Sequence, residues 1–279
     1  MSKQPLITGI AVLLTTALLS AASAQVPRIA DESFDCLMDA SARVNLGAQV
    51  AGVLRAVHVT RGDRVEVGRP IAQLASEVEE ATALLARVRA QNDTSIGANE
   101  AKLDLARRRL ARIASLRATG TSTEKDYDEA NAEVRVAALT LRDSVLNLEA
   151  ARAEMKRAEE QLAQRRILSP ITGVVVERHL SPGEYVHDQA HIVTLASIDV
   201  LHVEVYVPVA FFGRIVRGGR AVVLPEAPVG GRHAAEVMVV DRVIDAASGT
   251  FGVRLRLPNP DWQLPAGLRC RVQFSAAAE

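Results

Sequence analysis

Aromatic residues and lysines are scarce in this sequence of 279 residues. Aromatic side chains make up 3% of the chain, which is low for one large β-sandwich or enzyme core, whereas Ala, Leu, Val, Arg and Glu dominate as they do in coiled coils. The 33 basic and 33 acidic side chains balance, which argues against nucleic acid as a partner because phosphate binding needs a concentrated basic surface. The lysines are Lys3, Lys102, Lys125 and Lys156.

Only one apolar run is long, and it lies in a predicted export signal, residues 1–24. Lys3 precedes the run, residues 6–19, and Ala22-Ser23-Ala24 has the small residues of a cleavage site. The run is shorter than the roughly 20 residues that span a bilayer, so cleavage is favoured over a retained anchor. No lipid-attachment motif precedes Cys36. We therefore expect a periplasmic chain with no retained transmembrane helix.

Cysteine is also rare, with Cys36 near one end of the chain and Cys270 near the other. Disulfides form in oxidising compartments such as the periplasm, so we predict that a bridge between these residues ties the chain ends together. Such a bridge requires Cα atoms within about 7 Å of each other. Two unrelated buried thiols are the alternative.

The middle third of the chain has the heptad pattern of a long helix. Large residues recur at intervals of seven, and small residues follow them by three positions. The large residues are Tyr127, Val134, Leu141, Leu148, Met155 and Leu162, and the small ones are Ala130, Ala137, Ser144, Ala151 and Ala158. This a/d seam lets a partner helix approach closely. Residues 76–118 repeat the pattern less regularly, because Asn92, Gly97 and Asn99 interrupt it.

The partner helix is predicted to be this preceding segment. Between the two, Gly120 suits a helix C-cap, and Ser122 or Thr123 suits the next N-cap. So short a connection makes the helices antiparallel neighbours. Residues 76–165 are therefore expected to form a long antiparallel α-helical hairpin with its tip near Gly120.

The segments on either side of the hairpin repeat each other at a fixed offset of 121 residues. The offset relates Gly52 to Gly173, His58 to His179, Gly62 to Gly183, Val65 to Val186 and Leu74 to Leu195. Alternating Val and Leu around Gly-Asp or Gly-Glu predicts short strands. The interrupted repeat indicates two half-motifs, residues 44–75 and 166–198, that combine into one pseudo-symmetric β-unit.

These half-motifs resemble the split lipoyl/biotinyl-like domain of HlyD-family periplasmic adaptors, also called membrane fusion proteins. The matching segments read GVLRAVHVTRGDRV from Gly52 and SPITGVVVERHLSPGEYV from Ser169. The resemblance implies an elongated, multidomain α+β fold that ends in a six-stranded type of β-barrel. The expected parts are the signal peptide (1–24), a segment joining the barrel (25–43), the first half-motif (44–75), the hairpin (76–165), the second half-motif (166–198) and the barrel (199–279).

The resemblance also implies a docking site at the hairpin tip. Adaptors of this family that dock on a TolC-type outer-membrane channel carry an Arg, a Leu four residues later and a Ser seven residues after that. Arg112, Leu116 and Thr123 have this spacing, and Thr123 keeps the hydroxyl. A solvated arginine beside a leucine of the seam is the alternative.

The partners implied are an inner-membrane transporter, the TolC-type channel and further copies of the chain in a ring, with no nucleic acid. The function implied is efflux of small molecules. The lack of a retained anchor favours a transporter of the resistance-nodulation-division (RND) class. An adaptor of an ABC-type export system and a structural coiled-coil envelope protein are alternatives. The family's membrane-proximal domain is expected to be missing or minimal, because five residues follow Phe274.

Rival functions need residues that this sequence does not have. A lipoyl or biotin carrier needs a lysine at a β-turn, and neither half-motif contains one. His187 and His191 are spaced like metal ligands on a helix, but they lie in strand-like sequence where such residues do not converge. The methionines after the signal are too widely spaced for a soft copper site. We expect no enzymatic activity, no cofactor and no metal site.

Overall fold

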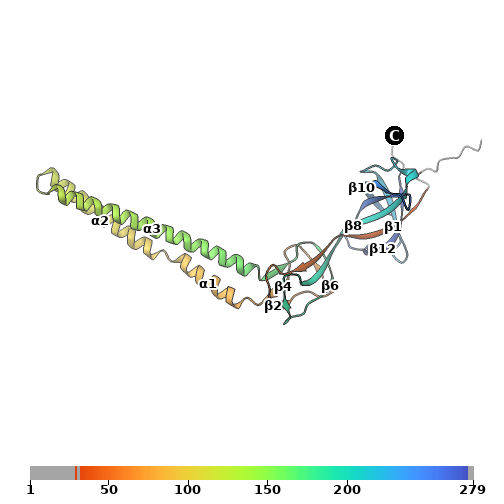
Figure 1. Ribbon diagram of the computed structural model, residues 1–279, viewed down its shortest axis with the longest axis horizontal. Coiled ribbons are helices and arrows are strands. Elements are labelled where there is room, and N and C mark those ends of the chain that lie inside the picture. Colours follow the sequence, from red (N-terminus) through yellow and green to blue (C-terminus); the bar gives the residue numbers. More distant parts are fainter. Residues whose placement is uncertain (1–28, 30–31, 276–279) are drawn as a thin grey trace, which may run out of the picture.

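The computed structural model describes residue 29 and residues 32–275. Figure 1 shows an elongated molecule with a helical arm at one end, a small β-unit in the middle and a β-barrel at the other end. The predicted signal peptide, residues 1–24, lies outside the described residues. Within the described part, no helix is both long and apolar enough to cross a membrane.

The elements alternate between the three parts of the molecule. In chain order they are β1 (Phe34–Gly47), β2 (Gly52–Val57), β3 (Arg64–Val65), β4 (Pro70–Leu74), α1 (Glu77–Gln91), α2 (Thr94–Ala118), α3 (Glu124–Ala163), β5 (Arg166–Leu168), β6 (Gly173–Arg178), β7 (Tyr185–Val186), β8 (His191–Pro208), the 3-10 helix η2 (Val209–Phe211), β9 (Arg220–Pro225), β10 (His233–Asp245), β11 (Thr250–Pro258) and β12 (Leu268–Phe274). The arm is thus an insertion between β4 and β5.

Six strands close the barrel in the order β1-β12-β9-β10-β11-β8, and β8 pairs back with β1. Side chains alternate between core and solvent along the strands. In β11, for example, Phe251, Val253, Leu255 and Leu257 are buried and the residues between them are more exposed. Closure removes free strand edges from the barrel, and the inward side chains give it an apolar core of its own.

Strands β1 and β8 belong to both β-domains. They pair antiparallel from Cys36 and Val205 in the barrel to Gly47 and His191 in the β-unit. The domain boundaries predicted after residues 43 and 198 therefore fall inside uninterrupted strands. A register shift near the middle of the pairing marks where the ribbon passes from one domain to the other, because bulges bend and twist a strand pair.

The β-unit is built from the two half-motifs. Strands β2, β3 and β4 recur 121 residues later as β6, β7 and the start of β8. The halves exchange strands, because β2 pairs with β7 and β3 pairs with β6. Equivalent hydrogen bonds hold both exchanges, from Gly62 N–H to Val175 O at 2.8 Å and from Gly183 N–H to Leu54 O at 2.7 Å. Neither half therefore completes its sheet alone.

The helical arm consists of α1, α2 and α3, and α3 packs against both other helices. Every position of the predicted seam on α3 is buried or half-buried. Small side chains at the most buried positions, including Ala130 and Ala158, let the helices approach closely. Buried Asn99 donates a hydrogen bond to Ser144 Oγ at 2.6 Å, and Ser144 donates to the Thr140 carbonyl at 3.0 Å. This polar pair is therefore satisfied.

The first half of the arm is broken between α1 and α2, at residues 92–93. Ala90 is buried in α1, and a strict heptad would place the next seam residue at Gly97. The seam of α2 instead passes through Ile96 and Leu103, one residue earlier. The break absorbs this shift, because the opposing helix α3 keeps an interval of seven throughout. Gly97, one of the residues that interrupt the heptad pattern in the sequence, lies inside α2.

Candidate functional site at the tip of the arm

The tip of the arm is a tight turn that ends α2 and precedes α3 (Figure 1). Gly120 has a φ of +73°, and its N–H donates to the Arg117 carbonyl at 3.0 Å. The Thr121 N–H donates to the Leu116 carbonyl at 2.9 Å. These two bonds form a Schellman motif, which satisfies carbonyls at the helix end. The turn lies where the sequence predicts it, and hydrogen bonds fix its backbone.

Thr123 is the N-cap of α3 and forms a capping box with Asp126. Thr123 Oγ1 accepts a hydrogen bond from Asp126 N–H at 3.2 Å, and the Asp126 carboxylate accepts from Thr123 N–H at 3.0 Å and from its hydroxyl at 2.6 Å. The hydroxyl bond, followed by the backbone bond, lowers the pKa of Asp126 below its usual value. The Thr123 hydroxyl therefore has only one lone pair left to offer a partner.

Arg112 and Leu116 lie one turn apart on the same face of α2. Leu116 is 42% exposed, whereas the nearby seam residue Ile113 is half-buried. Among the described residues Arg112 makes no ion pair, although Arg109 pairs with Glu133 on α3 at 2.9 Å. The tip thus presents an exposed cation and an exposed leucine side by side.

Arg117 joins the two sides of the turn. Its guanidinium forms an ion pair with Glu124 and lies over the ring of Tyr127, 4.8 Å from the ring centroid. Heptad and capping patterns do not single out this residue, although a basic residue in the last turn of one helix and an acidic residue in the first turn of the next are a recognisable signal. Arg117 thus ties the end of α2, which carries Arg112 and Leu116, to the start of α3.

The residues predicted for docking are therefore brought to one end of the arm, on both sides of one turn. They place an exposed cation and an exposed apolar side chain beside a backbone that hydrogen bonds hold in place. Within the described residues, no group of three or more His, Cys, Asp or Glu is arranged to hold a metal ion. His179 instead contacts Thr194 Oγ1 through Nε2 at 2.8 Å.

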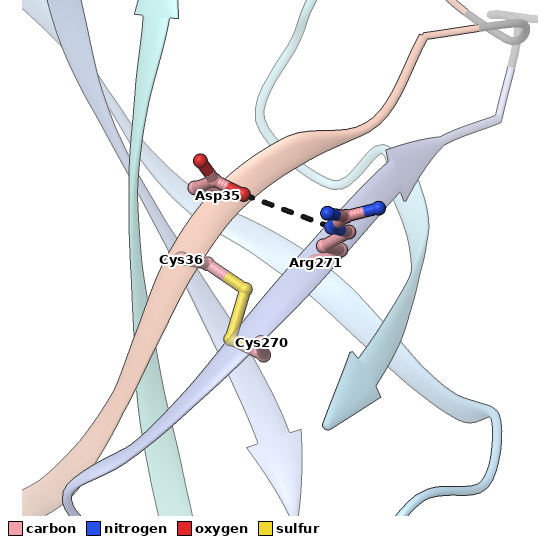
Figure 2. The surroundings of a disulfide bond; sticks show 4 residues. All are labelled: Asp35, Cys36, Cys270 and Arg271. Carbon is pink, nitrogen blue, oxygen red and sulfur yellow. Dashed lines mark ion pairs between the residues drawn. A yellow bond between two sulfur atoms is a disulfide. The ribbon is translucent and has the colours of Figure 1, made fainter. Parts of the chain in front are cut away.

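The predicted cysteine pair lies at the opposite end of the molecule, in the barrel. Cys36 and Cys270 face each other in the antiparallel strands β1 and β12. Their Cα atoms are 4.9 Å apart and a disulfide joins them, as Figure 2 shows. Beside it, Arg271 pairs with Asp35 at 3.8 Å, and this exposed pair stabilises the fold little. The bridge staples the first strand of the barrel to the last.

An interlocked β-unit with an inserted helical arm and an adjoining barrel is the architecture of membrane fusion proteins. The crystal structure of MacA from Actinobacillus actinomycetemcomitans superposes with a TM-score of 0.71 at 19% identity, over 88% of this chain and 78% of that chain. The membrane fusion protein Spr0693 from Streptococcus pneumoniae R6 superposes with a TM-score of 0.60 at 14% identity, over 88% of this chain and 100% of that chain. At these identities the likeness shows the fold.

The chain belongs to the family defined by the CzcB-like barrel-sandwich hybrid domain, whose family model matches residues 42–197. This confirms the prediction that it is a membrane fusion protein. It is 27% identical over 229 residues to the cobalt-zinc-cadmium resistance protein CzcB of Cupriavidus metallidurans, covering 82% of this chain and 42% of that protein. It is 26% identical over 249 residues to the macrolide export protein MacA of Escherichia coli O157:H7, covering 85% of this chain and 66% of that protein. The chain thus spans less than two thirds of the length of these relatives.

Proposed function

We propose that this protein is a periplasmic adaptor that links an inner-membrane transporter to a TolC-type outer-membrane channel for the efflux of small molecules. The observation that carries the proposal is the tip of the arm, where Arg112 and Leu116 are exposed beside a turn fixed by a Schellman motif and a capping box. A fixed backbone lowers the entropic cost of docking. The proposed role is non-enzymatic.

The transporter is proposed to be of the RND class, on the resemblance described from the sequence. The names of the relatives do not separate transporter classes, because they include a cobalt-zinc-cadmium resistance protein and a macrolide export protein. An ABC-type exporter is therefore the alternative partner. Crosslinking from the barrel in cells, followed by identification of the crosslinked transporter, distinguishes the two classes.

Copies of the chain are proposed to pack side by side in a ring. The outer faces of the arm support this proposal, because large apolar side chains are exposed on α2 and α3 away from the seam. They are Leu105, Val136, Leu139 and Leu146. Single exposed apolar residues are common on protein surfaces, but a stripe on adjacent turns is typical of an interaction surface.

Channel docking is tested by crosslinking from the tip. A photoreactive amino acid in place of Ser115 should crosslink to the outer-membrane channel in cells, and Arg112→Asp or Leu116→Asp should abolish that crosslink and raise susceptibility to the exported compounds. The control Leu84→Asp changes an equally apolar, exposed residue of α1, near the base of the arm, and should leave the crosslink intact. Unchanged crosslinking in both tip variants would refute docking and leave the structural envelope protein as the alternative.

A further inference from the structure

One segment caps the end of the barrel that lies farthest from the helical arm. Strand β8 runs out of the β-unit and ends at Pro208. The capping segment, residues 209–220, follows it and ends at the first residue of β9. The end of the β10–β11 hairpin lies beside it, because Val209 N–H donates to the Gly249 carbonyl at 2.9 Å. We call this end of the molecule, residues 209–220 with residues 241–249, the barrel pole (Figure 1).

Large apolar side chains of the barrel pole are exposed to solvent. Val209, Phe212 and Val216 keep between 45% and 53% of their surface exposed, and Val243 keeps more. Phe212 is held by an edge-on contact with the buried ring of Phe251, at 5.3 Å between centroids. Exposed aromatic and aliphatic side chains gathered at one place mark an interaction surface.

Arginines accompany these apolar residues in the sequence: Arg214 lies between Phe212 and Val216, and two more follow Val216. Arg214, Arg217 and Arg220 line a cavity of about 450 Å³ whose other walls are mainly apolar, among them Ile215 and Phe274. No carboxylate of the described residues lines this cavity. The sequence contains no Asp or Glu between residues 204 and 226, so the capping segment is uniformly basic.

The carboxylates of the barrel pole lie on the β10–β11 hairpin. They are Asp241 and Asp245, and the second accepts hydrogen bonds from Ser248 Oγ at 2.8 Å and from Ala247 N–H at 2.9 Å within its own turn. With Arg242 included, the pole carries four arginines against these two aspartates, and Glu236 lies opposite Arg220 in the pairing of β10 with β9. The surface is therefore basic as well as apolar.

We propose that the barrel pole binds the surface of an anionic phospholipid bilayer. Guanidinium groups bind phosphates, and apolar side chains beside them enter the boundary between headgroups and acyl chains. Residues 209–220 hold three arginines, three large exposed apolar side chains and no carboxylate, a combination whose charge and apolar surface match the headgroup boundary of an anionic bilayer. Lipid binding by the pole goes beyond the proposed function. It rests on that function only for the orientation of the molecule, because docking of the tip at the outer membrane would turn the pole towards the inner membrane.

Vesicle binding tests this proposal with the full chain. The protein should sediment with vesicles of mixed phosphatidylcholine and phosphatidylglycerol but not with phosphatidylcholine alone, and added salt should weaken the binding. Arg217→Ala/Arg220→Ala should lower the partition coefficient by about fivefold per arginine, or roughly 25-fold in total. Arg107→Ala/Arg135→Ala, which removes two exposed arginines from the arm, is the matched control and should bind like the wild type.

Equal binding of the wild type and Arg217→Ala/Arg220→Ala would overturn the proposal, as would equal binding to neutral vesicles. The proposal would also fail if Arg217→Ala/Arg220→Ala kept its vesicle binding but lost a crosslink from the pole to an acidic inner-membrane protein. The pole would then be a protein-binding surface. The Leu116→Asp variant separates this test from that of channel docking, since it should lose the channel crosslink and still bind vesicles.

Discussion

Removing the disulfide between Cys36 and Cys270 should lower the free energy of unfolding of the barrel by up to about 5 kcal/mol. The bridge joins residues 234 positions apart, and in the loop-entropy description a closed loop of this length removes about 5 kcal/mol of conformational entropy from the unfolded chain. This is an upper bound, because measured disulfides typically contribute about 2–4 kcal/mol. Cys36→Ala/Cys270→Ala keeps both positions apolar, which suits their burial in the barrel core.

The only tryptophan of the chain, Trp262, reports on the barrel separately from the helical arm. It lies between β11 and β12, and the Arg64 guanidinium from the β-unit lies 4.8 Å from its ring centroid. Urea titration followed by the fluorescence of this tryptophan should show the same decrease in the free energy of unfolding for the reduced wild type and for Cys36→Ala/Cys270→Ala. Reductant should not affect the variant. A variant within about 1 kcal/mol of the oxidised wild type would refute the loop-entropy reasoning.

Three further predictions concern the tip and the β-unit. Thr123→Ala should destabilise the start of α3 by about 1 kcal/mol, measured as faster amide exchange there. Capping by Thr123 lowers the pKa of Asp126, so the ionised carboxylate stabilises the folded tip at pH values above the unfolded pKa. This stabilisation is lost as the pH falls through the folded pKa, below about pH 4. Equal amide-exchange protection of the wild-type tip above and below that pH would contradict this prediction. Gly173→Ala should disrupt the β-unit, because the new Cβ would lie 2.2 Å from the Ala196 carbonyl oxygen, whereas Gly52→Ala meets only the far end of an arginine side chain at 2.8 Å. Similar melting temperatures of the two glycine variants would argue against this close approach.

The half-motifs show what repetition in the sequence can predict. The offset of 121 residues located β2 to β4 and their counterparts β6, β7 and the start of β8, with turns that include Gly62 and Gly183, which share a φ of +93°. These features are local, because a glycine at a turn and alternating apolar residues specify a strand and its end within a few residues. The exchange of strands between the halves was not predicted, because it depends on how the arm brings two distant segments together.

At the tip of the arm, too, the sequence predicts features within one helix turn but not contacts between helices. Gly120 marked the turn, and Ser122 or Thr123 marked the cap, which the structure places at Thr123, since such residues act on backbone groups within their own turn. The contacts of Arg117 with Glu124 and Tyr127 cross from one helix to the next, and heptad spacing does not reveal them.

Heptad spacing, capping residues and the internal repeat predicted a helical arm and a split β-unit, and the absence of lysine from both half-motifs argued against a lipoyl or biotin carrier. The class of membrane fusion proteins and the second β-domain came from the resemblance of the half-motifs to HlyD-family adaptors. Only the folded structure shows that the arm breaks at residues 92–93 and that β1 and β8 pass through both β-domains. Only the folded structure also shows that Cys36 lies opposite Cys270 and that three of the four arginines of the barrel pole line one cavity. The physical reason is that periodicity reports which side of a helix or strand is buried, whereas register, pairing and shared surfaces arise only when segments far apart in the chain pack together.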